Sequence, residues 1–302
     1  MCRILPVAIL AFIGLLTACS SAEPASVAST KEPVPTSEAT PVQTPRPTGV
    51  SYSIEGQPFG VGPTVSPTPI PIHHPPPYTV AIEAGHGGPS WWGSSAYHDG
   101  QRYIEKDLNL DMALRLNALL LDRGFNTILL RDGDYTLLPF DGASYRPSFT
   151  TETQARVDLA NEAQADIIIS LHFNGSTVSS IGGTETYYNP DRSFGNESHN
   201  LASFVHDAVL RALGEIEGYS VRDRGVRNDA EVGGDPANAH SYLLGTNRRF
   251  RPSLMPGIIA EPLFMSDSEN LAVIVHDAHR QRLAEAMAEG IAAYFEWLWP
   301  VG

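Results

Sequence analysis

Short strand-like segments alternate with segments of helical periodicity along residues 78–302 of this chain. The strand-like segments are rich in apolar, aromatic or β-branched residues: 79–82, 126–130, 165–171, 184–188 and 257–260. The helical segments repeat an apolar residue every three or four positions: 107–122, 151–164, 200–213 and 278–297. This alternation predicts an α/β fold, a single domain whose twisted, mostly parallel sheet carries helices on both faces. About 225 residues are enough for one hydrophobic core.

The N-terminal part of the chain does not share this pattern. Arg3 precedes an apolar run at 5–16, which ends in Leu16-Thr17-Ala18-Cys19. Residues 1–19 are therefore predicted to be a lipoprotein signal peptide that is cut before Cys19, the residue that then receives lipid. An ordinary secretory signal that ends in Cys is the alternative. Residues 20–77 are rich in Pro, Ser and Thr and predict a disordered linker, so the exported protein is expected to be anchored to a membrane by its N-terminus only.

Composition limits the chemistry and the partners of the chain. Its two cysteines are Cys2 and Cys19, so the mature chain keeps one cysteine and has no thiolate for catalysis or for a Cys-type zinc site. The net charge of −14 argues against nucleic acid and anionic membrane surfaces as direct partners. An uncharged or zwitterionic substrate remains compatible with this charge.

Four polar residues lie where the predicted elements begin or end. His86 comes just after one strand-like segment, His172 ends a second and Glu261 ends a third. Because ligands bind at the carboxyl ends of strands in open α/β sheets, we expect these three side chains to meet at one sheet edge. Glu105 precedes the first helix on the same stripe as Leu108, so it is expected to face the sheet and not the solvent.

Two histidines and a glutamate form the ligand set of a catalytic zinc ion with one open position. A fourth carboxylate, Glu261, could then act as the base that a metal-bound water needs. Each residue also has a plainer interpretation, since a strand-end histidine is often structural and a glutamate often starts a helix. Glu261 is harder to explain that way, because a buried carboxylate needs a partner. Together the four residues predict a hydrolase with a single zinc ion.

Six motifs extend this pattern along the chain and occur in a fixed order. They are Gly85-His86-Gly87-Gly88, Glu105-Lys106-Asp107-Leu108-Asn109-Leu110, Arg156-Val157-Asp158-Leu159-Ala160-Asn161, Ser170-Leu171-His172, Gly182-Gly183-Thr184-Glu185-Thr186-Tyr187-Tyr188 and Glu261-Pro262-Leu263-Phe264-Met265-Ser266. In this order they resemble the zinc-dependent N-acetylmuramoyl-L-alanine amidases of the type-3 (AmiC/CwlD-like) family. The resemblance covers essentially the whole stretch from Thr79 to Phe295, and makes residues 78–302 the expected catalytic domain.

The resemblance implies a reaction, a substrate and a role for each site residue. His86, Glu105 and His172 would bind zinc, and Glu261 would be the catalytic carboxylate. The reaction would be hydrolysis of the amide bond between N-acetylmuramic acid and L-alanine of peptidoglycan, in the bacterial cell envelope. Two alternatives stay open: a zinc peptidase or amidohydrolase that cuts another cell-wall peptide bond, and a catalytically silent wall-binding lipoprotein.

The chain departs from the family pattern beside the expected site. Glu83-Ala84 stands where the family usually has Asp-Pro, Pro262 replaces a common Gly and Asp267 replaces a common Asn. These changes bear on rate or substrate preference more than on the class of reaction. The aromatic pair Trp91 and Trp92 follows the first expected ligand; it could stack on a sugar, but packing within a loop is favoured.

Two further features concern the substrate. The segment 220–256 is longer than expected and contains six arginines: Arg222, Arg224, Arg227, Arg248, Arg249 and Arg251. It is either a solvated loop or a wall that meets stem-peptide carboxylates, with Arg248 as the candidate contact. Asn174 lies two residues after His172 and either orients substrate or forms a turn with Gly175 and Ser176.

The predicted connection at 189–200 bears on regulation. Some relatives carry a long helical insertion here that plugs the zinc site until a partner removes it. In this chain the segment is short, polar and without apolar periodicity, so it should not form an occluding helix. We therefore expect a monomer that is active without an activator, unless segment 220–256 covers the site, for example through Glu231.

Overall fold

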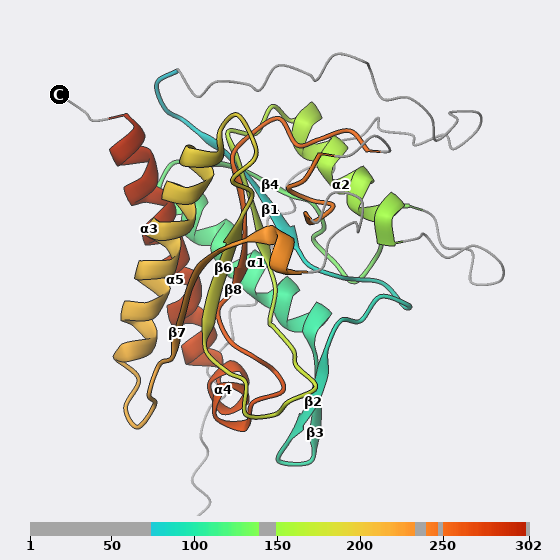
Figure 1. Cartoon of the computed structure of the whole chain (residues 1–302), viewed down its shortest axis with the longest axis vertical. Coiled ribbons are helices and arrows are strands. Elements are labelled where there is room, and N and C mark those ends of the chain that lie inside the picture. The colour runs from blue at the N-terminus through green and yellow to red at the C-terminus, as the bar shows by residue number, and fades with distance from the viewer. Residues whose placement is uncertain (1–73, 139–148, 233–239, 247–249, 300–302) are drawn as a thin grey trace, which may run out of the picture. The chain divides into compact units, whose positions relative to one another are not determined.

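A six-stranded sheet forms the centre of the computed structural model, which describes residues 74–138, 149–232, 240–246 and 250–299 (Figure 1). The strand order is β4-β1-β5-β8-β6-β7. The strands are β1 (Thr79–Ala84), β4 (Asn126–Leu129), β5 (Ile167–Leu171), β6 (Thr184–Tyr188), β7 (Asp223–Asn228) and β8 (Gly257–Glu261). Strands β4, β1, β5 and β8 are parallel, β6 is antiparallel to β8, and β7 is parallel to β6. The predicted mostly parallel sheet is confirmed.

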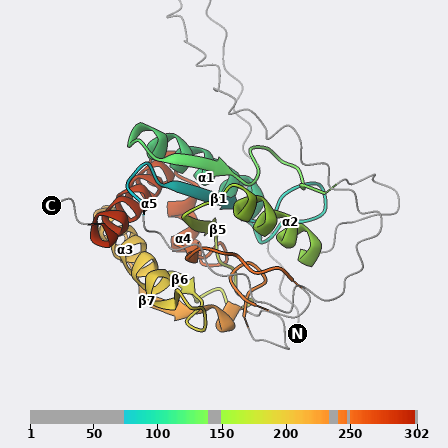
Figure 2. The same ribbon diagram turned by 90° about the horizontal axis from the view of Figure 1, so that it is seen from above.

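Helices cover both faces of the sheet, as predicted (Figure 2). One face carries α1 (Glu105–Asp122), α3 (Gly195–Gly214) and α5 (Asp277–Leu298), and the other carries α2 (Phe149–Glu162). The short helix α4 (Ser268–Ile274) and a 3-10 turn, η1 (Asp229–Val232), lie in the connections. Within the described residues, no helix has both the length and the apolar character needed to span a membrane.

The two faces of the sheet bury different side chains of the same strands. Along β1, Val80 and Ile82 pack toward α1 and α5, whereas Ala81 packs with Val157 of α2. This follows from the two-residue period of a strand, which points successive side chains to opposite faces. The α2 face therefore receives the odd-numbered positions of β1, and Glu83 is one of them. The same face becomes polar toward the carboxyl ends of the strands.

Every strand and helix that the sequence predicts is present, with ends that differ by a few residues. The largest difference is at α3, which begins at Gly195 and leaves only Asn189–Phe194 as the connection after β6. The hairpin of β2 (Ser95–His98) and β3 (Gln101–Ile104), strand β7 and helix α4 were not predicted. Strand β7 lies within segment 220–256 and has the polar sequence Asp-Arg-Gly-Val-Arg-Asn, so no apolar pattern marks it.

Candidate metal centre

Three of the predicted site residues meet at the carboxyl edge of the sheet. His86 follows β1, Glu105 is the first residue of α1 and His172 follows β5. The Oε1 atom of Glu105 lies 3.0 Å from Nε2 of His86 and 2.9 Å from Nδ1 of His172. One potential ligand atom from each side chain lies within 4.8 Å of the other two. The helix start thus brings its carboxylate between two imidazole nitrogens from neighbouring strands.

The backbone around these residues leaves no room for side chains. A Cβ atom on Gly85 would lie 2.2 Å from the imidazole ring of His172, and one on Gly93 would lie 2.4 Å from Oε2 of Glu105. His86 itself adopts a left-handed conformation with φ of 63°, which is rare for a residue with a side chain. Such strain persists only where the surrounding structure holds it, and it is common at functional sites.

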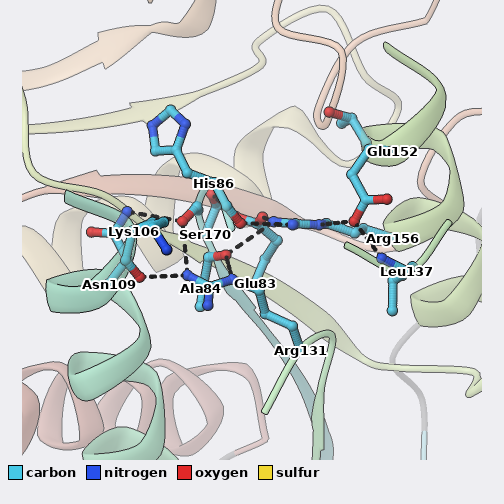
Figure 3. Close-up of polar contacts among 12 residues, drawn as sticks. Glu83, Ala84, His86, Lys106, Asn109, Arg131, Leu137, Glu152, Arg156 and Ser170 are labelled. Atoms are coloured by element: carbon cyan, nitrogen blue, oxygen red, sulfur yellow. Dashed lines mark hydrogen bonds and ion pairs between the residues drawn. The ribbon is translucent and has the colours of Figure 1, made fainter. Parts of the chain in front are cut away.

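Two buried guanidinium groups hold the strained turn (Figure 3). Arg131 donates to the carbonyl oxygens of Ala84 and Gly85 at 2.7 and 3.0 Å. Arg156 donates to the carbonyl oxygen of His86 at 2.7 Å. Burial lowers the pKa of Arg131 to about 10, which leaves it charged at neutral pH. These contacts fix the course of the backbone from Ala84 to His86.

Glu83, where the family resemblance leads to an expected Asp, lines the same site. Its carboxylate pairs with Arg156 and accepts a hydrogen bond from Ser170 Oγ at 2.6 Å. Arg156 also contacts Glu152, so the buried guanidinium lies between two carboxylates (Figure 3). Buried charges are tolerated when they are paired and hydrogen-bonded in this way. The Glu83 oxygen that accepts from Ser170, Oε2, also lies 3.8 Å from Nε2 of His172.

The surroundings of His172 are strongly negative. Burial opposes charge on its imidazole, but the hydrogen bond to Glu105 and the nearby carboxylates of Glu261 and Glu83 outweigh it and raise the pKa of His172 to about 9. Burial would raise the pKa of Glu105, yet the hydrogen bonds from His172 and His86 hold it far below its usual value. Two imidazoles among three carboxylates form a site whose charge suits a bound cation.

Glu261 differs from the other carboxylates because one of its oxygens has no partner. It ends β8, is 8% exposed, and its Oε2 atom is buried with no hydrogen-bond partner in the described part of the chain. Burial raises the pKa of Glu261 to about 8 against the opposing charge of His172, and the charges of Glu105 and Glu185 add smaller contributions in the same direction as burial. A free carboxylate oxygen with a raised pKa suits proton transfer.

A single cavity of about 330 Å³ contains the four residues. Asn174 also borders it, and its side chain is held on both sides: Oδ1 accepts from Gly175 N at 2.8 Å and Nδ2 donates to Glu185 Oε2 at 2.9 Å. The hydrogen bond from Gly175 N supports the interpretation of Asn174 as a turn residue. Glu185 was not singled out as functional, and two of its partners, Arg224 and Arg227, lie on β7, a strand that the sequence did not predict.

The arginines of segment 220–256 have partners within the protein where the structure describes them. Arg224 and Arg227 contact Glu185, Arg222 donates to the carbonyl oxygen of Ser180 at 3.2 Å, and Arg251 pairs with Asp158. Arg248, the predicted substrate contact, lies outside the described residues, as do Arg249 and the predicted lipidation site Cys19. Part of the segment does reach the cavity, which is lined by Val232, Ser241, Tyr242 and Leu243.

The site and fold match a known family. A family profile described as N-acetylmuramoyl-L-alanine amidase, Amidase_3, matches residues 80–293. The chain is 29% identical over 219 residues to the amidase LytC of Bacillus subtilis, which covers 72% of this chain and 35% of LytC. It is also similar to the solved catalytic domain of the amidase CwlV of Bacillus (Paenibacillus) polymyxa, with 26% identity and a TM-score of 0.54 over 72% of this chain and 98% of that domain.

A second solved structure agrees with this assignment. The N-acetylmuramoyl-L-alanine amidase of Clostridium difficile 630 shares 25% identity and a TM-score of 0.55 with the chain, covering 74% of it and 98% of that structure. The matched residues contain all four residues of the candidate site and every strand of the large sheet except the first residue of β1. The chain therefore belongs to the Amidase_3 family of N-acetylmuramoyl-L-alanine amidases.

Proposed function

We propose that this protein hydrolyses the amide bond between N-acetylmuramic acid and L-alanine of peptidoglycan, with His86, Glu105 and His172 as zinc ligands and Glu261 as the proton carrier. The family gives the activity and the substrate. The observation that carries the assignment of roles is the cavity itself, where a His–Glu–His set lies beside a buried carboxylate with one free oxygen. A protein that only binds the cell wall would need neither the His–Glu–His set nor a buried carboxylate with a free oxygen.

The three donor residues fit one zinc ion. Two imidazole nitrogens and one carboxylate oxygen are a ligand set of hydrolytic zinc sites. When bound, zinc polarises the scissile carbonyl and makes water a stronger nucleophile. Two hydrogen bonds within the protein hold these ligands in position. Ser94 N donates to Glu105 Oε2 at 2.7 Å, and Asn109 Nδ2 donates to the carbonyl oxygen of Gly85 at 3.1 Å. These contacts orient the carboxylate and the turn that carries His86.

Glu261 would move the proton in both halves of the reaction. Its free oxygen accepts a proton from the attacking water and then delivers it to the leaving nitrogen of L-alanine. Glu261 must be ionised to accept this proton, and burial, which raises its pKa, then helps it hold the proton until the leaving nitrogen takes it. Glu261 ends β8, the strand that pairs with β5, and His172 follows β5 directly, so the carboxylate lies in the same cavity as the three ligand residues.

The proposed bond can be separated from the alternatives by the products. Purified peptidoglycan is digested with the zinc-loaded protein and the fragments are analysed by mass. The proposal expects free stem peptides that begin with L-alanine, together with glycan strands that have lost their peptides. New ends at another peptide bond would instead identify a zinc peptidase or a different amidohydrolase. No new ends at all, with retained binding to the wall, would identify a silent binding module.

We also propose that the protein works from the membrane through lipid on Cys19. The support is sequence alone: Leu16-Thr17-Ala18-Cys19 ends an apolar run, and a Pro-, Ser- and Thr-rich segment follows before the catalytic domain. Peptidoglycan as substrate places the activity in the cell envelope. A linker of this composition would let a membrane-anchored, monomeric enzyme reach the wall above it.

A further inference from the structure

The catalytic cavity is aromatic on one side. Trp91 follows β1 and its ring lies 5.2 Å from that of His86 and 4.9 Å from that of Phe149, centre to centre. Phe149, the first residue of α2, lies 5.7 Å from the ring of Tyr242. All three rings line the cavity. We call this set, Trp91, Phe149 and Tyr242, the aromatic wall.

The other side of the cavity is polar and carries cationic groups behind it. Asn174 and Gly175 line it, and Glu185 holds the Asn174 side chain. Arg224 and Arg227 of β7 contact the same buried carboxylate, and Arg227 also pairs with the more exposed carboxylate of Glu231. In the strand order β1-β5-β8-β6-β7, Trp91 follows β1 and the arginines lie on β7, on opposite sides of β5 and β8, the strands that lead to His172 and Glu261.

The two halves of the substrate differ in the same way. The sugar side of the scissile amide is uncharged, because the lactyl carboxyl group of muramic acid is part of the amide, and a pyranose ring presents faces of C–H groups. The peptide side carries carboxylates. Ring C–H faces pack on aromatic side chains, whereas carboxylates are attracted by guanidinium groups. The carbonyl under attack lies between the two halves, just as the donor cluster lies between the aromatic and the cationic sides.

We propose that the aromatic wall is the binding subsite for the N-acetylmuramic acid ring, with the stem peptide directed toward Asn174 and β7. This proposal rests on the proposed function. Phe149 is the residue that carries it, since this residue is 49% exposed and its ring lies between two cavity-lining rings. A ring that served only to pack α2 against the turn after His86 would be buried. The sequence favoured a packing role for Trp91, and this proposal adds a contact with the sugar.

Phe149→Ala tests the subsite with two substrates that share the scissile amide. One is a muramoyl-peptide, and the other is the same peptide acylated with lactic acid alone, which lacks the sugar ring. In the zinc-loaded full-length protein, the variant should lose about fivefold to tenfold in kcat/KM on the muramoyl-peptide, mostly through KM. The loss should fall below about twofold on the lactyl-peptide, because the missing contact is then absent from both proteins.

Two variants control this experiment. Phe149→Tyr keeps the ring and should stay within about twofold of the parent on both substrates. Trp92→Ala removes a neighbouring aromatic residue of similar exposure, 43%, that does not line the cavity, and should leave both activities unchanged. An equal loss of Phe149→Ala on both substrates would show a packing role and overturn the proposal. No loss on either substrate would overturn it as well.

A binding measurement separates this proposal from the proposed function. Saturation-transfer NMR with a peptide-free disaccharide that contains N-acetylmuramic acid reports contact with the sugar without turnover. Signal with the parent and its loss with Phe149→Ala would support the subsite even if the protein cut no peptidoglycan, which would refute the proposed function alone. Cleavage of the muramoyl-peptide with an unchanged NMR signal in Phe149→Ala would refute the subsite and leave the proposed function standing.

Discussion

Glu185 and Glu261 face each other as a cross-strand pair on β6 and β8, yet their carboxylates are held in opposite ways. Burial would raise the pKa of Glu185, but hydrogen bonds from Tyr187 and Arg224, with the charge of Arg227, lower it. Glu261 has a free oxygen, and burial raises its pKa to about 8. Two neighbouring acids whose pKa values are pushed apart are typical of an active site with distinct roles for each.

Replacement of Glu261 by Gln should abolish turnover while the fold and the zinc content stay unchanged. Gln has the same shape but cannot carry a proton, and a proton-transfer group typically contributes about 10²–10⁴-fold. Hydrolysis of peptidoglycan and zinc content are measured on the same preparation. Glu217→Gln is the control. Glu217 is exposed and does not line the cavity, so this variant should retain activity. A Glu261→Gln variant within a few-fold of the parent would exclude Glu261 as the base.

His172→Ala should have a different effect, because it removes a ligand and not a proton carrier. The zinc content of the purified protein should fall from about one ion per chain toward none, since three protein ligands are the usual minimum for a catalytic zinc. Metal analysis after dialysis checks this directly. Retention of a full equivalent of zinc would mean that the ion is bound elsewhere.

The fold predicts a pH-dependent contribution of Asp111 to stability. Burial would raise the pKa of Asp111, but hydrogen bonds from Arg115 and from Arg280 of α5 lower it. A lowered folded-state pKa means that the contribution is present above the unfolded value of about 4 and is lost as the pH falls below it. Asp111→Asn should therefore lower the melting temperature at pH 7 more than at pH 3.

Thermal unfolding at the two pH values measures this difference. Because Asp111 is about one-third exposed, the effect should be modest. Asp122→Asn, an exposed change at the end of the same helix, is the matched control. Equal destabilisation by Asp111→Asn at both pH values would show that charge is not the cause.

Activity should not require an activator protein. The connection Asn189–Phe194 after β6 is too short for an occluding helix, and Glu231, the alternative plug, is paired with Arg227. Purified protein should cut peptidoglycan without any addition, and Glu231→Gln should not raise the rate. Activity that appears only after a second protein is added would contradict this account of regulation.

Cys19→Ala should release the protein from the membrane and leave the activity per molecule unchanged. The change removes the predicted lipidation site without touching the catalytic domain. Fractionation of cells that express each form measures the distribution, and a peptidoglycan digest measures the activity. A variant that stays with the membrane after export would argue against lipid on Cys19.

The sequence could predict that these four side chains meet because their positions follow from strand and helix boundaries. His86, His172 and Glu261 each come at the carboxyl end of a strand, and the apolar stripe of α1 places Glu105 toward the sheet. Strand ends are marked by the residues on either side of them, so local patterns in the sequence are enough to place these four side chains.

The residues that support the site could not be predicted in the same way. Arg156 reaches Glu83 and His86 across about seventy positions, and the motif that begins with Arg156 does not reveal these contacts. The surroundings of Glu185 depend on β7, whose polar sequence with Gly225 gives no strand pattern. Tyr242 and Phe149 meet Trp91 only through the packing of α2 and a connection against one face of the sheet. These are tertiary contacts, and periodicity carries no information about them.

The most direct test of the central claim is a peptidoglycan digest with protein stripped of metal, repeated after one equivalent of zinc is restored, with the products identified by mass. The account predicts no release of peptide from the stripped protein and, after zinc is restored, stem peptides with L-alanine at their N-terminus. Full release of these peptides by the stripped protein, or cuts only at other bonds after zinc is restored, would contradict it.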